Sequence, residues 1–290
     1  MRRWLFTSLI LFGTSAFADD QNPGARDKAY INEVENPEGE SHEKVLHAEP
    51  LYIDLIRDLG ARAGELEVNL GYGLSDKREF VKMDYLAEIE WAPINRLGVE
   101  FELPVTDFVR FGNASGDEPA RQGLASYKLA AQYTWFVSEK FATSSAVGYL
   151  HEFLRNPAMS ISDAAQSGNG NGALDLAGNL YNPFFVVARR WGNNWHSLLY
   201  TGPRYTAAIS RDWLWQNNLS VHYMLTGTRH FIGLEINQDF KPDGTVATVF
   251  RPQMRLQFTD HVLAGIVTGI PANLRAEGLS TFLRLIYELP

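Results

Sequence analysis

Acidic side chains stand at alternate positions in the first three apolar segments after residue 63. Alternation gathers such side chains on one face of a β-strand, which predicts an acidic wall made of Glu65, Glu67, Asp84, Glu88, Glu90, Glu100 and Glu102. Later segments carry basic side chains in the same phase, namely Lys128, Arg190, Arg204, Arg251, Arg255 and Arg284. We keep three interpretations of this charged interior: salt bridges that fill it, a water-filled passage whose transverse field selects polar solutes, and a cation site on the carboxylates.

Two further sets of residues have the composition of a catalytic site. Asn218, Ser220 and His222 alternate in NLSVH, and His151 stands beside Glu152. Side chains on one face of a strand are roughly 7 Å apart and run parallel, whereas a serine hydrolase needs them to converge. No G-x-S-x-G or H-E-x-x-H motif occurs in the chain. A polar strand face and a histidine at a rim explain both sets, so we expect no catalytic residues.

Candidate metal ligands are sparse. His42, Glu43, His47 and Glu49 offer nitrogen and oxygen donors, but their spacing matches no ligand motif. The stretch SGNGNGALDLAGN, residues 167–179, has oxygen donors suited to Ca²⁺, although a surface loop has the same composition. The chain contains no cysteine, which removes thiolate sites and disulfides. We therefore expect neither a metal ion nor another cofactor.

The polar positions alternate with apolar ones over most of the chain. In GELEVNLGYGL, for example, Leu66, Val68 and Leu70 alternate with polar residues and glycine. Most such segments are near the roughly 9–11 residues of a tilted transmembrane strand, longer than the roughly five or six usual in soluble sheets. The pattern predicts twelve antiparallel strands at 64–74, 80–91, 97–106, 122–137, 141–154, 180–191, 195–207, 217–226, 230–240, 245–258, 262–270 and 279–289.

The connections between these segments alternate in length. Even-numbered segments are followed by tight turns such as APINR, SEK and GNN, whereas odd-numbered ones are mostly followed by longer loops, including 107–121 and 155–179. Short periplasmic turns and longer outer loops are typical of outer-membrane barrels. A soluble meander has no reason to separate loop lengths by end. The alternation therefore predicts an all-β, closed transmembrane barrel with both termini on the short-turn side.

The positions of tryptophan agree with a membrane barrel. Six tryptophans follow the first twenty residues, and all lie at segment ends, where an amphipathic ring suits the lipid interface: Trp91, Trp135, Trp191, Trp195, Trp213 and Trp215. Over residues 64–290 the chain resembles Gram-negative outer-membrane β-barrels, and it is similar in layout to small channel and hydrocarbon-transporter barrels. The resemblance implies a porin-like barrel in the cell outer membrane and no particular solute.

The first eighteen residues have the features of a secretory signal peptide. Arg2 and Arg3 precede an apolar run that ends in an A-x-A site at Ala18. The run is shorter than the roughly 20 residues of a transmembrane helix. Cleavage after Ala18 would change the formal net charge from −8 to about −10. This acidic balance argues against nucleic acid, so we expect outer-membrane lipid and small solutes as partners.

Two segments separate the signal peptide from the first strand. Residues 19–46 are rich in Asp, Glu, Asn, Pro and Gly, which predicts a disordered periplasmic linker. The stretch HAEPLYIDLIRDLGA, residues 47–61, has helical spacing of apolar residues, followed by Gly60 as a stop. We predict an amphipathic helix over 47–63 that plugs the barrel or docks at its periplasmic mouth, lies at the membrane interface, or binds a periplasmic protein. Its apolar face consists of Leu51, Tyr52, Leu55, Ile56 and Leu59.

Passive passage or binding of small solutes is the function that these features favour, with the helix and loop 155–179 as gating elements. The alternative from another class is a non-conducting structural or interaction barrel that is filled by its own side chains. A third hypothesis is an enzyme at the rim that acts on lipid or peptide, for which His151 is the best residue.

Overall fold

The structure is a computed structural model that describes residues 22–37, 42–53, 55–76, 80–110, 123–155, 176–207, 211–273 and 278–289. The expected signal peptide, most of loop 155–179 and most of the glycine-rich stretch within it lie outside these residues. No α-helix in the described part is long and apolar enough to cross a membrane.

The described strands form one antiparallel sheet that closes on itself. Neighbours along the chain pair with one another, and the last strand pairs with the first, for example Tyr287 with Val68. The two-residue strand β4 and strand β5 both pair with β3 and are separated only by Ala125, so they count as one wall strand and the barrel has twelve. The prediction of a twelve-stranded barrel is confirmed. The strands are β1 (Leu66–Asp76), β2 (Phe80–Ile94), β3 (Leu97–Arg110), β4 (Gly123–Leu124), β5 (Ser126–Ser138), β6 (Thr143–Arg155), β7 (Leu176–Trp191), β8 (Trp195–Ala207), β9 (Arg211–Met224), β10 (Phe231–Phe240), β11 (Val246–Gln257), β12 (Val262–Pro271) and β13 (Ser280–Glu288).

Side chains alternate between the two faces of the wall. In β1, Asn69 is fully buried inside the barrel, while its neighbour Leu70 is 55 % exposed on the outside. In β13, Arg284 is buried inside, and Leu283 and Leu285 are exposed outside. The outer face of the strands is therefore apolar, as contact with hydrocarbon requires, and the lumen is polar.

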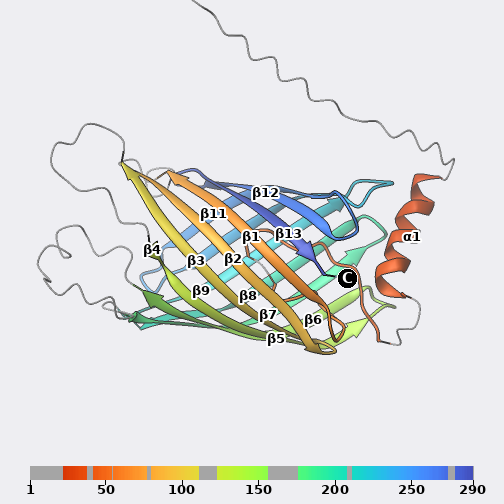
Figure 1. Ribbon diagram of the computed structural model, residues 1–290, viewed down its shortest axis with the longest axis horizontal. Helices are drawn as coiled ribbons and strands as arrows, with labels where there is room; N and C mark the ends of the chain where they lie inside the picture. Colours follow the sequence, from red (N-terminus) through yellow and green to blue (C-terminus); the bar gives the residue numbers. More distant parts are fainter. Residues whose placement is uncertain are drawn as a thin grey trace, which may run out of the picture.

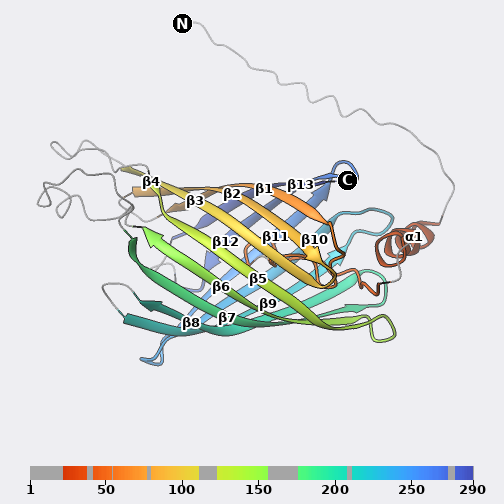
Figure 2. The same cartoon turned by 60° about the horizontal axis from the view of Figure 1, so that its bottom comes forward.

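The two ends of the barrel differ. The turns at 95–96, 139–142 and 192–194 lie at one end, here called the short-turn end, and the C-terminus lies there too (Figure 1). Helix α1 (Pro23–Glu35) lies across this end, outside the barrel, and the chain that follows it turns into the barrel (Figures 1 and 2). The N-terminal part of the chain therefore covers the short-turn end.

Local signals explain why α1 forms where it does. The side chain of Asn22 caps the helix by accepting a hydrogen bond from the Gly24 backbone N at 3.1 Å. Pro23 occupies the first helical position, where its missing N–H has no partner to lose.

A single stripe of α1 docks on the barrel, at Asp27, Ile31 and Glu35. Asp27 accepts hydrogen bonds from the Gly227 backbone N at 2.7 Å and from Asn194 Nδ2 at 3.0 Å. The prediction of a disordered linker over 19–46 is wrong for this helix. The composition of the segment is polar, but its most buried side chains stand at helical spacing and dock the helix on the barrel.

Replacing Asp27 with alanine is expected to loosen α1 while the barrel stays folded. The substitution leaves two donors without their acceptor, which costs about 1–3 kcal/mol of docking free energy. Trypsin should then cut after Arg26 and Lys28 about ten-fold faster or more. The variant Ala29→Ser, on the exposed side of α1, is the control; an unchanged cleavage rate in Asp27→Ala would contradict the docking role.

The described residues of the predicted amphipathic helix, 47–53 and 55–63, are not helical. The chain here follows an irregular path inside the barrel, and residues 42–53 and 55–63 are called the lumen strap (Figure 2). An isolated helix of this length is marginal in water, so a wall that offers hydrogen bonds and apolar contacts can override it. The barrel does carry a short N-terminal helix, as predicted, but that helix is α1.

Candidate functional site

The leucine and isoleucine side chains of the predicted helix face pack against the barrel wall in two places. Leu51 lies among buried side chains of β12 and β13, namely Leu263, Val267 and Ile286. Leu55, Ile56 and Leu59 lie in a second cluster with residues of β5 to β8, namely Ala130, Ala146, Phe184, Val186, Ala188, Leu198 and Tyr200. The spacing that predicted a helix thus serves two contacts with the wall.

Polar contacts fix the first residues of the predicted helix. His47 Nε2 lies 2.9 Å from Ser144 Oγ, and the Ala48 backbone N donates to His196 Nδ1 at 3.1 Å. Burial, assisted by the positive charge of Arg190, lowers the pKa of His47 to about 3. The imidazole of His47 is therefore neutral near neutral pH.

The next backbone amides are bound by side chains of the wall. The Leu51 N donates to Gln253 Oε1 at 2.7 Å. The Ile53 N donates to Glu235 Oε1 at 3.0 Å, and the Tyr52 N donates to the other oxygen of the same carboxylate at 3.4 Å. These bonds replace those that a helix would have made within itself.

Ion pairs bind the strap on both sides of this stretch. Glu49 pairs with Arg255 at 2.8 Å, and Lys44 Nζ lies 2.7 Å from Asp58 and 2.8 Å from Glu65. Burial alone would raise the pKa of Asp58, but Lys44 and a neighbouring guanidinium hold it well below its usual range.

Arg57 is the strongest ionic anchor of the strap. It is buried, and its Nη1 lies 2.5 Å from Glu67 and 3.6 Å from Glu90, while its Nε lies 3.9 Å from Glu65. Its backbone oxygen accepts a hydrogen bond from Gln132 Nε2 at 2.7 Å. Part of the acidic wall therefore binds a cation supplied by the chain itself.

Two glycines of the wall make room for the strap. A Cβ at Gly98 would lie 2.5 Å from the Cβ of Arg57, and a Cβ at Gly265 would lie 2.4 Å from Cδ2 of Leu51. Both distances are shorter than real contacts, so β3 and β12 admit the strap because these positions lack side chains.

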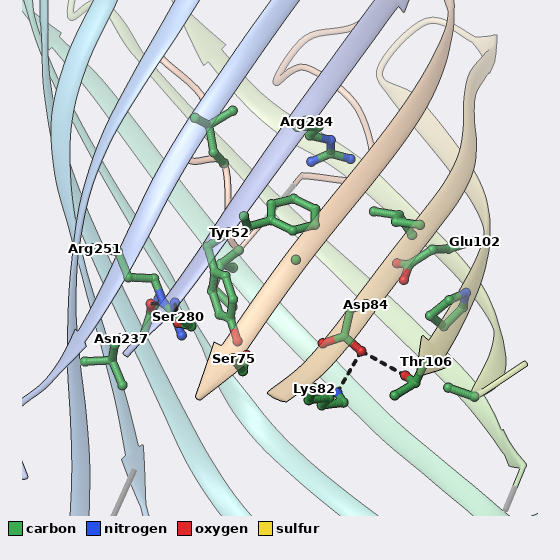
Figure 3. A pocket seen from close by; sticks show the side chains of 18 of the residues that line it. Tyr52, Ser75, Lys82, Asp84, Glu102, Thr106, Asn237, Arg251, Ser280 and Arg284 are labelled. Atoms are coloured by element: carbon green, nitrogen blue, oxygen red, sulfur yellow. Dashed lines mark hydrogen bonds and ion pairs between the residues drawn. The ribbon is translucent and has the colours of Figure 1, made fainter. Parts of the chain in front are cut away.

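The lumen strap lies between two cavities that share no lining residue. The outer cavity, of about 560 Å³, is lined by Leu51, Tyr52 and Ile53 of the strap and by the wall toward the end opposite α1 (Figure 3). The inner cavity, of about 320 Å³, lies between the strap and α1, with Tyr30 of the helix among its lining residues. The strap thus divides the described lumen.

Most charges of the outer cavity are paired with one another. Its lining includes five acidic and five basic side chains. Asp84 accepts from both Lys82 and Thr106 at 2.8 Å, as Figure 3 shows. The four ion pairs of the lining are Lys82–Asp84, Lys128–Glu102, Arg204–Asp239 and Arg284–Glu88. Internal salt bridging therefore accounts for most of the charge that the sequence placed inside.

Because the last strand must pair with the first to close the barrel, the sequence predicts that Arg284 meets Glu65 and Glu67, but it binds neither. It pairs with Glu88 of β2 instead. Its neighbour in β1 is Gly71, which has no side chain, so the guanidinium reaches across β1 to the next strand. The two expected partners bind the strap.

The acidic wall contains one compact group of carboxylates. Oxygens of Glu88, Glu100 and Glu102 lie within 4.8 Å of one another. Lys128 binds Glu102 and Arg284 binds Glu88, so protein cations already satisfy two of the three. Oxygen ligands suit a hard cation, but cations of the wall already bind two of these three carboxylates.

The two candidate catalytic sets do not form in the described part of the chain. Asn218, Ser220 and His222 lie on the inward face of β9, but Ser220 Oγ makes no hydrogen bond there, so no serine–histidine pair exists. Glu152 lines the outer cavity, whereas His151 lies on the opposite, outer face of β6.

The candidate metal ligands before the first strand do not converge. His42 Nε2 accepts a hydrogen bond from Arg96, while His47 and Glu49 bind different strands and Glu43 is exposed. Three of these side chains bind separate parts of the barrel, and the fourth lies on the surface.

The six tryptophans have exposed side chains on the outside of the barrel. Trp213 and Trp215 belong to β9, which begins at Arg211 and not at residue 217, where the alternation in the sequence placed its start. Tertiary pairing with β8 extends this strand beyond the segment where alternation is clear. The other four lie at the short-turn end: Trp91, Trp135, Trp191 and Trp195.

Several residues that hold the strap backbone are not among those that the sequence predicts as site residues. Glu235 is fully buried and fits the same alternation in β10, so the period could have identified it. Thr134, which accepts from the Gly60 N at 3.1 Å, and Gln132 are neutral and give no comparable signal.

The fold is similar to that of known outer-membrane barrels. An outer-membrane channel from Pseudomonas putida F1 is 16 % identical over 83 % of this chain and 100 % of that chain, with a TM-score of 0.55. A KdgM porin is 10 % identical over 77 % of this chain and 99 % of that chain, with a TM-score of 0.51. At sequence identities this low, the structural similarity establishes the fold and does not identify a solute.

No curated protein matches the chain in sequence. A family profile described as HAEPLYID-like matches residues 43–288, which include the whole strap after His42 and nearly all of the barrel. Residues 47–54 of this chain read HAEPLYID, and this is the stretch that the wall holds through Gln253 and Glu235. The chain belongs to the HAEPLYID-like family.

Proposed function

We propose that the protein is an outer-membrane channel for small polar solutes and that the lumen strap is its gate. The observation that carries the proposal is the position of the strap between two cavities that share no lining residue. A solute that crosses the barrel must pass this segment, so transport requires the strap to move.

Location in the outer membrane is part of the proposal. The apolar outer face of the strands suits hydrocarbon, and the first eighteen residues have the sequence features expected of a signal peptide. Two similar folds are those of an outer-membrane channel and a porin. These features together favour a channel over a soluble barrel.

The contacts of the strap suit a gate better than a permanent filling. Many of them are hydrogen bonds and ion pairs, such as those of Leu51 with Gln253 and of Glu49 with Arg255. Water or a polar solute can replace such bonds at small net cost, whereas a lumen filled by tightly packed apolar side chains has no such exchange. The rival function, a non-conducting structural barrel, is favoured by the paired charges of the lumen.

Locking the strap to β12 tests the gate. A Cβ at Gly265 would lie 3.1 Å from Cγ of Leu51. This matches the separation of about 3 Å between the Cβ of one cysteine and the sulfur of the other in a disulfide. Because the chain has no cysteine, the double variant Leu51→Cys/Gly265→Cys contains a single pair. In planar bilayers the oxidised form should carry less than about a tenth of the current of the reduced form.

The single variants Leu51→Cys and Gly265→Cys are the matched controls, and their currents should not respond to oxidant or reductant. Formation of the disulfide is checked by migration on non-reducing gels. Equal currents in the oxidised and reduced double variant would contradict the gate. Absence of current in the reduced variants and in the unmodified protein would contradict the channel and favour the structural barrel.

A further inference from the structure

The four ion pairs of the outer cavity leave two of its charged side chains unpaired, one basic and one acidic, on different parts of the wall. Arg251 of β11 and Glu152 of β6 both line the cavity, and neither forms an ion pair with a described residue. The strands that carry them lie far apart in the order of the sheet. A basic and an acidic group therefore face the same space from different parts of the wall.

Arg251 is held so that part of its guanidinium stays available. Its Nε donates to Asn237 Oδ1 at 2.5 Å, and its Nη1 donates to Ser280 Oγ at 3.3 Å. The ring of Tyr52 covers one face of the guanidinium, with 3.2 Å between Cζ and the ring centroid (Figure 3). Stacking occupies a face and leaves the in-plane N–H groups, and Nη2 donates to no described residue.

A second donor stands close to this guanidinium. Asn237 Nδ2 donates to Asn218 Oδ1 at 2.8 Å, so Asn237 connects Asn218 with Arg251. The Nδ2 of Asn218 is buried and has no partner in the described part of the chain. The buried carboxylate of Glu235 lies nearby, but its oxygens already accept from the strap amides, from Asn237 and from Gln253. Two unfilled donors and a positive charge suit an acceptor-only group, which a carboxylate is.

The opposite wall has an excess of negative charge. Glu152 lies opposite Lys128 in the register of β5 and β6, but Lys128 binds Glu102 at 2.5 Å. Glu100 stands beside these groups and makes no ion pair with a described residue. The ammonium of Lys128 is thus surrounded by more carboxylates than it can neutralise, and the ammonium of a solute would be attracted to this wall.

We propose that the outer cavity binds zwitterionic solutes, namely free amino acids or short peptides, with the carboxylate at Arg251 and the ammonium at Glu152. A solute with only one charge would gain from one wall and be repelled by the other, whereas a zwitterion matches both. The assignment rests on the proposed function, since it names the solute class that the same lumen takes.

Calorimetric titration of the whole protein in detergent tests the assignment with three probes that share the triglycine backbone. Triglycine carries both charges, N-acetyl-triglycine lacks the ammonium, and triglycinamide lacks the carboxylate. Triglycine should bind at least about ten-fold more tightly than either analogue, because each loses one charge-assisted contact. Equal affinities for the three probes, or no binding of triglycine at millimolar concentration, would overturn the proposal.

Variants assign the two ends of the ligand. Arg251→Met should abolish the preference for triglycine over its amide and retain the preference over the acetylated form, and Glu152→Gln should do the reverse. Arg189→Met, an arginine on the outer surface beside Trp191, is the control and should change neither ratio. If Arg251→Met loses the heat-modifiable migration of a folded barrel, Arg251→Lys replaces it. Arg251→Lys should reduce in part the preference for triglycine over triglycinamide. Calorimetry does not require conduction, so failure of the channel and failure of this assignment are told apart.

Discussion

Replacing Arg57 with methionine is expected to release the lumen strap and to raise the current of the protein in planar bilayers. The guanidinium is buried between Glu67 and Glu90, at 2.5 and 3.6 Å, so its loss leaves buried carboxylates without a counter-charge. Removal of one partner of a buried ion pair costs about 3–5 kcal/mol, which is about two to nearly four orders of magnitude in the docking equilibrium constant. Trypsin cleavage at Arg62 should rise with the current.

Two comparisons make this result specific. Gly98→Val displaces the strap by sterics and keeps every charge, since a Cβ at Gly98 would lie 2.5 Å from the Cβ of Arg57 and 3.2 Å from the Ile56 oxygen. Gly98→Val should therefore also raise the current and the cleavage at Arg62. It tests the anchoring role if the Arg57→Met barrel does not assemble. Arg189→Met is the matched control, because Arg189 lies on the outer surface, where its guanidinium stacks on Trp191. Folded Arg57→Met and Gly98→Val barrels with the current of the unmodified protein would contradict the anchoring role.

Lowering the pH from 7 to 5 is expected to loosen the strap through His47. Burial, with Arg190 nearby, lowers the pKa of His47 to about 3 when the strap is docked, whereas a free strap has a pKa near the usual value of about 6.5. Below pH 6.5 the free strap binds a proton that the docked strap does not hold, so docking weakens as the pH falls. Proton linkage at His47 changes the docking equilibrium constant of the strap by at most about 25-fold between pH 7 and 5. Bilayer current and trypsin cleavage both report it.

Other groups of the strap titrate differently, so the test is a difference between two proteins. Burial and the charge of Asp58 raise the pKa of Glu49, and that shift favours docking as the pH falls. The pKa of Asp58 itself is held low by Lys44 despite burial, and its contribution is lost only below its usual range. The variant His47→Gln keeps a donor for Ser144 and does not titrate, so it should show weaker loss of docking between pH 7 and 5. Equal pH dependence in both proteins would exclude His47 as the sensor.

The barrel could be predicted because its signal is local and repeated. Every strand contacts lipid on one face and the lumen on the other, so each must alternate, as Asn69 and Leu70 do. Ends of strands were less certain, because pairing with a neighbour extends a strand beyond its alternating part. Strand β9 begins at Arg211 and takes in Trp213 and Trp215 for this reason.

The inward side chains could be predicted from the period, but their partners could not. Arg284 has the phase that places it inside, yet its partner depends on the absence of a side chain at Gly71. Similarly, nothing in the alternation shows that Arg57 of the strap binds Glu67. Register and the path of a segment through the lumen are properties of the closed barrel.

The sequence by itself determined a twelve-stranded barrel, its apolar outside and its charged inside, because these follow from a period of two that each strand carries alone. Only the tertiary structure decided what residues 47–61 do. Their apolar spacing fits a helix, but the wall supplies Gln253 and Glu235 for their amides and glycines at positions 98 and 265 for their approach. Contacts between residues some two hundred positions apart outweigh a local preference that is marginal in water.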